Sequence, residues 1–201
     1  MPKYVDHEQR RGTLAAAVVR IASGRGLQAV SMREVAAEAG VSLRVVQYYF
    51  HSKDDLLTGT LRHLGEQLAS RVRQRVAATS RTPTPRQVLQ GALTAIIPTD
   101  DQSRQIMLAY TAFYNYTLTD PGLAADGLRY AAALEDFFAQ RIGEAQAAGE
   151  LRPDIDPHQT AAALFALTNG LSLSVLVGQR DGDAAVAILN QHLDGLLAIR
   201  R

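Results

Sequence analysis

The residue types that most often perform catalysis or bind metals are scattered along this sequence. The five histidines stand at positions 7, 51, 63, 158 and 192, and no two of them have the spacing of a metal-ligand pair. Cysteine is absent, which excludes disulfides and thiolate metal sites. The sequence contains no nucleophile-elbow serine, glycine-rich phosphate loop or acid–base constellation. We therefore expect a protein that is not an enzyme and uses no metal or other cofactor.

Positive charge is concentrated in the first 80 residues. They contain 12 Lys and Arg against 7 Asp and Glu, whereas the remaining residues contain 9 against 13, within a net charge of +1. A basic segment before an acidic remainder indicates that the first part faces a polyanion, although chance clustering of solvated charges is an alternative. The N-terminal sequence lacks the apolar run of a secretory signal, and we expect a cytoplasmic protein.

Residues 31–50 fit a helix-turn-helix. Ser31 and Ser42 are suitable N-caps for two short helices, and Glu34 has the spacing to complete a capping box with Ser31. Ala36 allows a close crossing of the helices, and Gly40 can form the turn between them. Four apolar residues are expected to face one small core: Val35, Val41, Val46 and Phe50. The outer side then carries Leu43, Arg44, Val45, Gln47, Tyr48 and Tyr49.

Helical periodicity continues through the rest of the chain, and no segment alternates as a strand would. We expect an all-α protein of about nine helices, with a three-helix domain that contains the helix-turn-helix at residues 1–55 and a second helical domain at residues 56–201. Asp183 is expected to cap the last helix, which would end near Ile199. Breaks between the later helices are predicted at Thr82–Pro85, Pro98–Asp101, Asp120–Gly122, Gly149 and Asp156–Pro157.

One predicted helix, at residues 157–178, carries no charge from Ala161 to Gly178. Its length meets the criterion for a membrane span. Polar and small residues interrupt it, however, and a helix that is apolar on all sides is also expected between a domain core and a second subunit. We favour the buried helix and expect no membrane association.

From Arg10 to Leu57 the sequence resembles the TetR family of transcriptional regulators. The resemblance rests on Met32-Arg33-Glu34-Val35-Ala36, on Ala39-Gly40-Val41-Ser42, and on Tyr49-Phe50-His51-Ser52-Lys53-Asp54-Asp55-Leu56-Leu57. Beyond Leu57, only the order and length of the helices are similar to the family. The chain departs from the family pattern at Val45-Val46-Gln47, where many members have Thr-Leu-Tyr.

The resemblance implies that the second helix of the motif enters the major groove of DNA. Arg44 would pair with guanine and Gln47 with adenine, while Leu43 and Val45 would pack on thymine methyl groups. The expected phosphate contacts are Ser31, Arg33, Ser42, Tyr48, Tyr49 and Lys53. A mobile basic arm of Lys3, Arg10 and Arg11 would touch the backbone or the minor groove. As alternatives, Tyr49 would be a packing residue, and Arg33 would pair with Glu34 or Glu38.

The resemblance also implies that residues 1–55 are the DNA-binding domain and residues 56–201 the effector-binding and dimerisation domain. A small-molecule effector of unknown identity would bind among the middle helices. The candidate pocket residues are Met107, Tyr110, Phe113, Tyr114, Phe137, Phe138 and Asn169. Tyr130 belongs to the same aromatic-rich stretch. The alternative is that these side chains simply fill a helical core.

The last two helices are expected to form half of a four-helix homodimer interface. Its candidate residues are Leu164, Phe165, Leu171, Val175, Ile188, Leu189, Leu193, Leu196 and Leu197. The function implied is that of a repressor released from a palindromic DNA operator by its effector. The alternatives are an activator of the same family and a helical adaptor that binds only protein.

Overall fold

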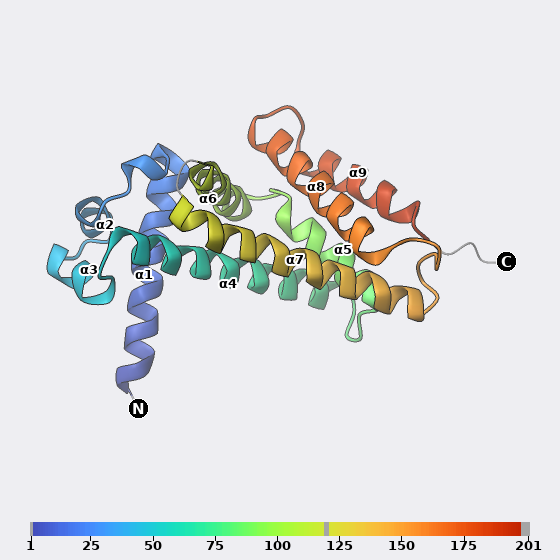
Figure 1. Cartoon of the computed structure of the whole chain (residues 1–201), viewed down its shortest axis with the longest axis horizontal. Coiled ribbons are helices and arrows are strands. Elements are labelled where there is room, and N and C mark those ends of the chain that lie inside the picture. The colour runs from blue at the N-terminus through green and yellow to red at the C-terminus, as the bar shows by residue number, and fades with distance from the viewer. Residues whose placement is uncertain (1, 119–120, 198–201) are drawn as a thin grey trace. The chain divides into compact units, whose positions relative to one another are not determined.

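The computed structural model describes the backbone of residues 2–118 and 121–197, and the side chains of residues 7–118, 129 and 131–197. These parts of the chain contain nine α-helices and one short 3₁₀ helix, which confirms the predicted all-α class (Figure 1). The helices are α1 (Pro2–Arg25), α2 (Met32–Glu38), α3 (Leu43–Tyr49), α4 (Lys53–Thr79), α5 (Pro85–Ile96), α6 (Asp101–Thr117), α7 (Pro121–Ala147), α8 (Pro157–Leu176) and α9 (Gly182–Asp194), with the 3₁₀ helix at Leu27–Ala29.

Helices α2 and α3 begin at the side-chain caps that the sequence predicts, and α5 begins at a further one. The hydroxyl oxygens of Ser31 and Ser42 each accept a hydrogen bond from the backbone N–H three residues later, at 3.1 and 3.4 Å. Thr84 and Gln87 form a complete capping box at the start of α5, with hydrogen bonds of 3.3 and 3.0 Å. Because these caps satisfy backbone donors that the helix itself leaves unpaired, short polar side chains fix where the helices start.

Two predicted caps are wrong. The carboxylate of Glu34 forms an ion pair of 2.8 Å with Arg25 on α1, so it does not complete the capping box with Ser31. Helix α9 is capped by Asp181, which accepts a hydrogen bond of 2.7 Å, and it ends at Asp194. Asp183 lies inside the first turn, where its charge is favourable next to the positive end of the helix dipole.

The helices form two compact units. The first comprises Met1–Gln67 and Leu108–Gly127, and the second comprises Leu68–Met107 and Leu128–Arg201. Segments of α4, α6 and α7 therefore belong to each unit, and Leu108–Gly127 joins the N-terminal residues although it is distant in sequence.

In the first unit, α1 packs against α2, and α2 packs against α3. Leu14, Val18 and Ile21 form a buried stripe on α1, and Val35 and Val46 are fully buried on the two short helices. Burying one such side chain contributes about 1.5–3 kcal/mol to the stability of the fold, relative to leaving it exposed. The small core thus holds the helix-turn-helix against α1.

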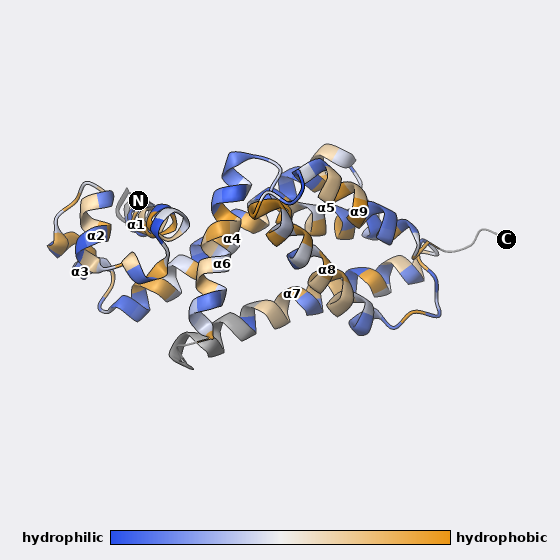
Figure 2. Ribbon diagram, turned by 90° about the horizontal axis from the view of Figure 1, so that it is seen from above, coloured by the Kyte–Doolittle hydropathy of each residue, from blue (hydrophilic) through white to orange (hydrophobic). Residues whose placement is uncertain are grey.

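In the second unit, α5 packs against α8 and α9. Helix α8 is coloured mainly in the hydrophobic range in Figure 2. It is long and apolar enough to cross a membrane by length and composition alone, but 44% of its most apolar stretch is buried in the chain. Buried Ser172 donates a hydrogen bond of 3.1 Å to the Ile96 carbonyl at the end of α5. This packing supports the prediction of a core helix.

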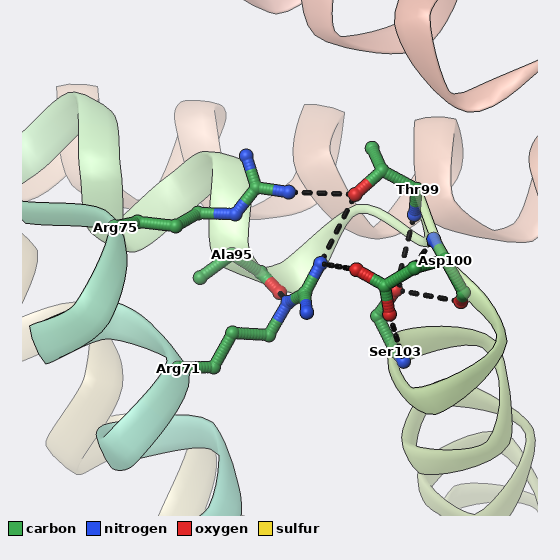
Figure 3. A network of polar contacts seen from close by, with 6 residues as sticks. All are labelled: Arg71, Arg75, Ala95, Thr99, Asp100 and Ser103. Carbon is green, nitrogen blue, oxygen red and sulfur yellow. Dashed lines mark hydrogen bonds and ion pairs between the residues drawn. The ribbon is translucent and has the colours of Figure 1, made fainter. Parts of the chain in front are cut away.

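A polar network fastens the α5–α6 connection to α4 (Figure 3). Arg71 donates hydrogen bonds to the Ala95 carbonyl at 3.2 Å, the Thr99 hydroxyl at 3.0 Å and the Asp100 carboxylate at 2.7 Å. Arg75 donates to the same Thr99 hydroxyl at 2.6 Å. Burial raises the pKa of Asp100, but hydrogen bonds from the Ser103 backbone and from Arg71 outweigh it and lower this pKa to about 2. The carboxylate is therefore charged at neutral pH and pairs with Arg71.

Candidate nucleic-acid interface

The turn between α2 and α3 depends on two small residues. Gly40 has a φ of +65°, a conformation that other L-residues rarely adopt. The N–H of Val41 donates to the Ala36 carbonyl at 2.9 Å, which closes the turn, and Ala36 itself is buried. These features set the angle between the two short helices, as the sequence predicts.

Phe50 fixes the end of α3 to α4. Its ring is only 1% exposed and occupies the space beside Gly59, where an added Cβ would lie 2.6 Å from Phe50 Cε1. The guanidinium carbon of Arg11 lies 4.6 Å from the ring centroid, in cation–π geometry, and Arg11 also pairs with Asp55 at 3.8 Å. Arg11 is therefore part of the scaffold.

The predicted mobile basic arm is replaced by a helix, since α1 begins at Pro2. Arg10 and Arg11 are neighbours in sequence but differ in surroundings: Arg10 is exposed, whereas Arg11 contacts Phe50 and Asp55. The side chain of Lys3 lies outside the described residues.

The predicted DNA-reading residues lie together on the outer side of α3. Arg44, Gln47 and Tyr48 are exposed, and Leu43, Val45 and Tyr49 are half-buried. A hollow of about 570 Å³ lies beside them, bordered by α1 on one side. Its lining is Arg10, Val41, Ser42, Arg44, Val45, Tyr48 and Tyr49.

Arg33 does not form the ion pair with Glu34 or Glu38 that was an alternative from the sequence. Glu34 pairs with Arg25 at 2.8 Å and Glu38 pairs with Arg20 at 2.7 Å. Arg33 is exposed, as is Ser31 at the same end of α2. Both ion pairs join α1 to α2, so they orient the motif and leave the cation of Arg33 for an external anion.

Lys53 is half-buried at the first position of α4, with its Nζ 5.8 Å from the centroid of the Tyr116 ring. Asp55 already occupies the N-terminus of this helix: it accepts a 3.0 Å hydrogen bond from the His51 N–H, and its own N–H donates to the Ser52 hydroxyl. Lys53 therefore offers a point charge to a phosphate, while the backbone N–H groups of His51 and Asp55 are bound by side chains of the protein itself.

Three aromatic rings meet at the end of α3. The ring centroids of Tyr48 and Tyr49 are 5.1 Å apart, edge to face, and His7 lies 6.0 Å from Tyr48 and 5.4 Å from Tyr49. The sequence does not predict the position of His7, because more than 40 residues separate it from its partners and no periodic pattern relates them.

The candidate effector residues divide between the two units. Tyr110, Phe113 and Tyr114 belong to the first unit, whereas Met107, Phe137, Phe138 and Asn169 belong to the second. Phe113, Phe138 and Met107 are buried, but Tyr114 is 69% exposed and Asn169 lies on the exposed side of α8. The side chain of Tyr130 lies outside the described residues.

Most of the candidate dimer residues fill the core of their own chain. Leu164, Leu171, Val175, Leu189 and Leu193 are buried within the second unit. Phe165 packs on Phe138 with ring centroids 5.9 Å apart, and Ile188 and Leu196 are half-buried. Only Leu197 of the set is exposed. The apolar residues of α8 and α9 thus mainly form the core of the second unit itself.

Helix α8 also has an outward side that carries no charge. Its exposed residues include two large apolar side chains near its C-terminal end, Leu173 and Val177. Smaller exposed residues precede them along the helix: Ala162, Ala163, Ala166, Asn169 and Gly170. Spacings of three and four residues place these on one face.

Comparisons with known proteins agree with this architecture. The family model described as "Bacterial regulatory proteins, tetR family" matches residues 14–59, and the model described as "BetI-type transcriptional repressor, C-terminal" matches residues 85–198. The regulator BetI of Burkholderia mallei is 31% identical over the full length of both chains. The regulator PksA of Bacillus subtilis is 27% identical over 98% of this chain and 94% of its own.

Solved structures show the same fold. A putative TetR-family regulator from Rhodococcus sp. has a TM-score of 0.85 at 24% identity and covers 94% of this chain and 99% of its own. A putative regulator from Saccharomonospora viridis, solved in complex with choline, has a TM-score of 0.79 at 26% identity and covers 96% of this chain and 99% of its own.

The helix-turn-helix, its basic outer face and the helical second unit define a DNA-binding transcriptional regulator. The chain belongs to the TetR family, with a C-terminal part of the BetI type.

The burial of His63 predicts that the stability of the first unit depends on pH. It lies on α4, and its Nε2 accepts a hydrogen bond from Gln67 at 3.0 Å. Burial lowers its pKa from 6.5, and the nearby negative charge of Glu66 offsets this only in part. In the unfolded chain the pKa of His63 is 6.5, so between the lowered pKa and pH 6.5 the unfolded chain binds more protons than the folded one. The contribution of His63 to the free energy of unfolding is therefore fully present above pH 6.5 and is lost as the pH falls below it.

We therefore expect the free energy of unfolding to fall more between pH 7.5 and 5.5 in the wild-type protein than in His63→Gln. Urea unfolding at the two pH values measures this difference. His158→Gln changes an exposed histidine and should retain the wild-type pH dependence. Equal pH dependence of the wild type and His63→Gln would show that His63 is not responsible.

Proposed function

We propose that this regulator is a cytoplasmic repressor that binds a palindromic operator as a homodimer and dissociates from it when a small molecule binds. The observation that carries the proposal is the basic, carboxylate-free outer face of α3, formed by Arg44, Gln47, Tyr48 and their neighbours. The match of residues 85–198 to a BetI-type repressor supports repression over activation.

In this proposal α3 lies in the major groove. Arg44 pairs with guanine, Gln47 lies near a base edge one turn further along, and Leu43 and Val45 contact thymine methyl groups. The phosphate contacts are Ser31, Arg33, Ser42, Tyr48, Tyr49 and Lys53. Two heads related by a two-fold axis would bind half-sites about 34–36 Å apart.

The function is tested by selecting bound sequences from random duplex DNA and then titrating the selected complex with small molecules. We expect a palindromic consensus and a steep loss of affinity with salt. Choline is the first ligand to test, because a structural neighbour is in complex with it and aromatic faces bind quaternary ammonium groups. Release requires a ligand with different affinities for the two states of the protein. A protein that binds no duplex would contradict the function.

Arg44→Ala should relax base preference at one symmetric operator position. A bidentate arginine–guanine pair contributes about 1–3 kcal/mol of discrimination, so preference at that position should fall by about 5-fold to 150-fold. Arg33→Ala is the matched comparison, since loss of a phosphate contact should weaken all sequences alike. An equal loss on every sequence for Arg44→Ala would assign Arg44 to a phosphate.

The homodimer is proposed to form through the exposed face of α8, because it carries apolar side chains and no charge. Leu173→Glu should convert the protein to a monomer in sedimentation analysis, since the exposed leucine would become a charge inside the interface. Leu118→Glu is the control, as Leu118 is 73% exposed on the first unit. A wild-type protein that sediments as a monomer at micromolar concentration would refute the dimer.

A further inference from the structure

The first turns of α1 extend beyond the core of the first unit. The buried stripe of α1 begins at Leu14, and none of the described side chains from residues 7–13 is buried. This part of the helix therefore adds little to the hydrophobic stability of the fold. Arg11 contacts Phe50 and Asp55, whereas His7 and Arg10 lie beside α3, through the aromatic contacts of His7 and the hollow that Arg10 lines.

The hollow between α1 and α3 has the chemistry of a phosphate site. Arg10 enters it from α1 and Arg44 from α3, and the hydroxyl-bearing residues Ser42, Tyr48 and Tyr49 line the same space. None of the lining residues is acidic. Guanidinium and hydroxyl groups without a competing carboxylate are the groups with which proteins bind the DNA backbone.

His7 restricts the two tyrosines of this surface. Tyr48 is 66% exposed, so without a neighbour its ring would sample several rotamers. His7 contacts both rings, and the tyrosine rings meet edge to face at 86°, which is a favoured aromatic geometry. Side chains held in the bound conformation lose less entropy when they bind.

Building on the proposed function, we propose that His7 is a positioning residue, which holds the rings of Tyr48 and Tyr49 for their contact with the DNA backbone. Arg10, which the family resemblance already implies as a backbone contact, borders the same hollow and would bind a phosphodiester beside the two tyrosines.

The role of Arg10 is tested with the selected operator at several salt concentrations. Arg10→Ala should weaken all sequences alike and reduce the slope of log affinity against log salt by about one, because one phosphate contact is lost. Arg73→Ala, an exposed arginine of the second unit, should leave the slope unchanged. An unchanged slope for Arg10→Ala, or a loss confined to certain base sequences, would overturn the phosphate assignment.

The role of His7 is tested by a double-mutant cycle. His7→Ala should weaken operator binding by about fivefold, and His7→Phe should restore it, because an aromatic ring is sufficient to hold the tyrosines. In a background of Tyr48→Leu with Tyr49→Leu, His7→Ala should have no further effect. Gln9→Ala, which changes an exposed residue of α1 two positions from His7, is the control for the helix itself.

The cycle also separates a positioning role from a structural one. The temperature of unfolding should not change in His7→Ala, because His7 lies outside the buried core. A full effect of His7→Ala in the double-leucine background, or failure of His7→Phe to restore binding, would overturn the role of His7. If the wild type binds no DNA, the proposed function fails; if the wild type binds and Arg10→Ala and His7→Ala match it, only this inference fails.

Discussion

The seating of Phe50 beside Gly59 is the contact on which the DNA-binding face depends. Phe50 ends α3 and is almost completely buried, and a side chain at position 59 would occupy the space of its ring. Because the ring cannot move without opening the core of the first unit, the rotation of α3 about its own axis is fixed. That rotation decides that Val46 points inward while Arg44, Gln47 and Tyr48 point outward. The chemistry of the outer face therefore follows from packing on its opposite side.

The arginines of the first unit divide into two groups with different tasks. Arg20 and Arg25 pair with Glu38 and Glu34, and Arg11 pairs with Asp55 and stacks on Phe50. These pairs hold α1 to α2 and to the start of α4. They also occupy the carboxylates of Glu34, Glu38 and Asp55, so that these groups do not neutralise Arg33 or Arg44. Each exposed pair contributes little to stability, about 0–1 kcal/mol. Their larger effect is on the sign of the charge on the surface that faces DNA.

Local chemistry made much of the fold predictable. Ser31, Ser42 and the Thr84–Gln87 box mark helix starts because a side-chain oxygen satisfies a backbone N–H only three residues away. The predictions for Glu34 and Asp183 were wrong although each residue has a suitable local spacing. Glu34 pairs with Arg25 instead, and α9 is capped by Asp181, two residues before Asp183. The apolar pattern of α8 and α9 gave the helices correctly but could not distinguish a chain's own core from an interface, since both require the same residue types.

The sequence by itself determined the all-α class, the helix-turn-helix at residues 31–50 and the outer face of α3, because helix periodicity, caps and the Gly40 turn are properties of neighbouring residues. Only the tertiary structure decided which charges are free. Arg10 and Arg11 are adjacent in the chain, yet one borders the hollow beside Arg44 and the other is held by Phe50 and Asp55. His7 meets Tyr48 and Tyr49 for the same reason: the placing of α1 beside α3 brings together residues that no local pattern connects.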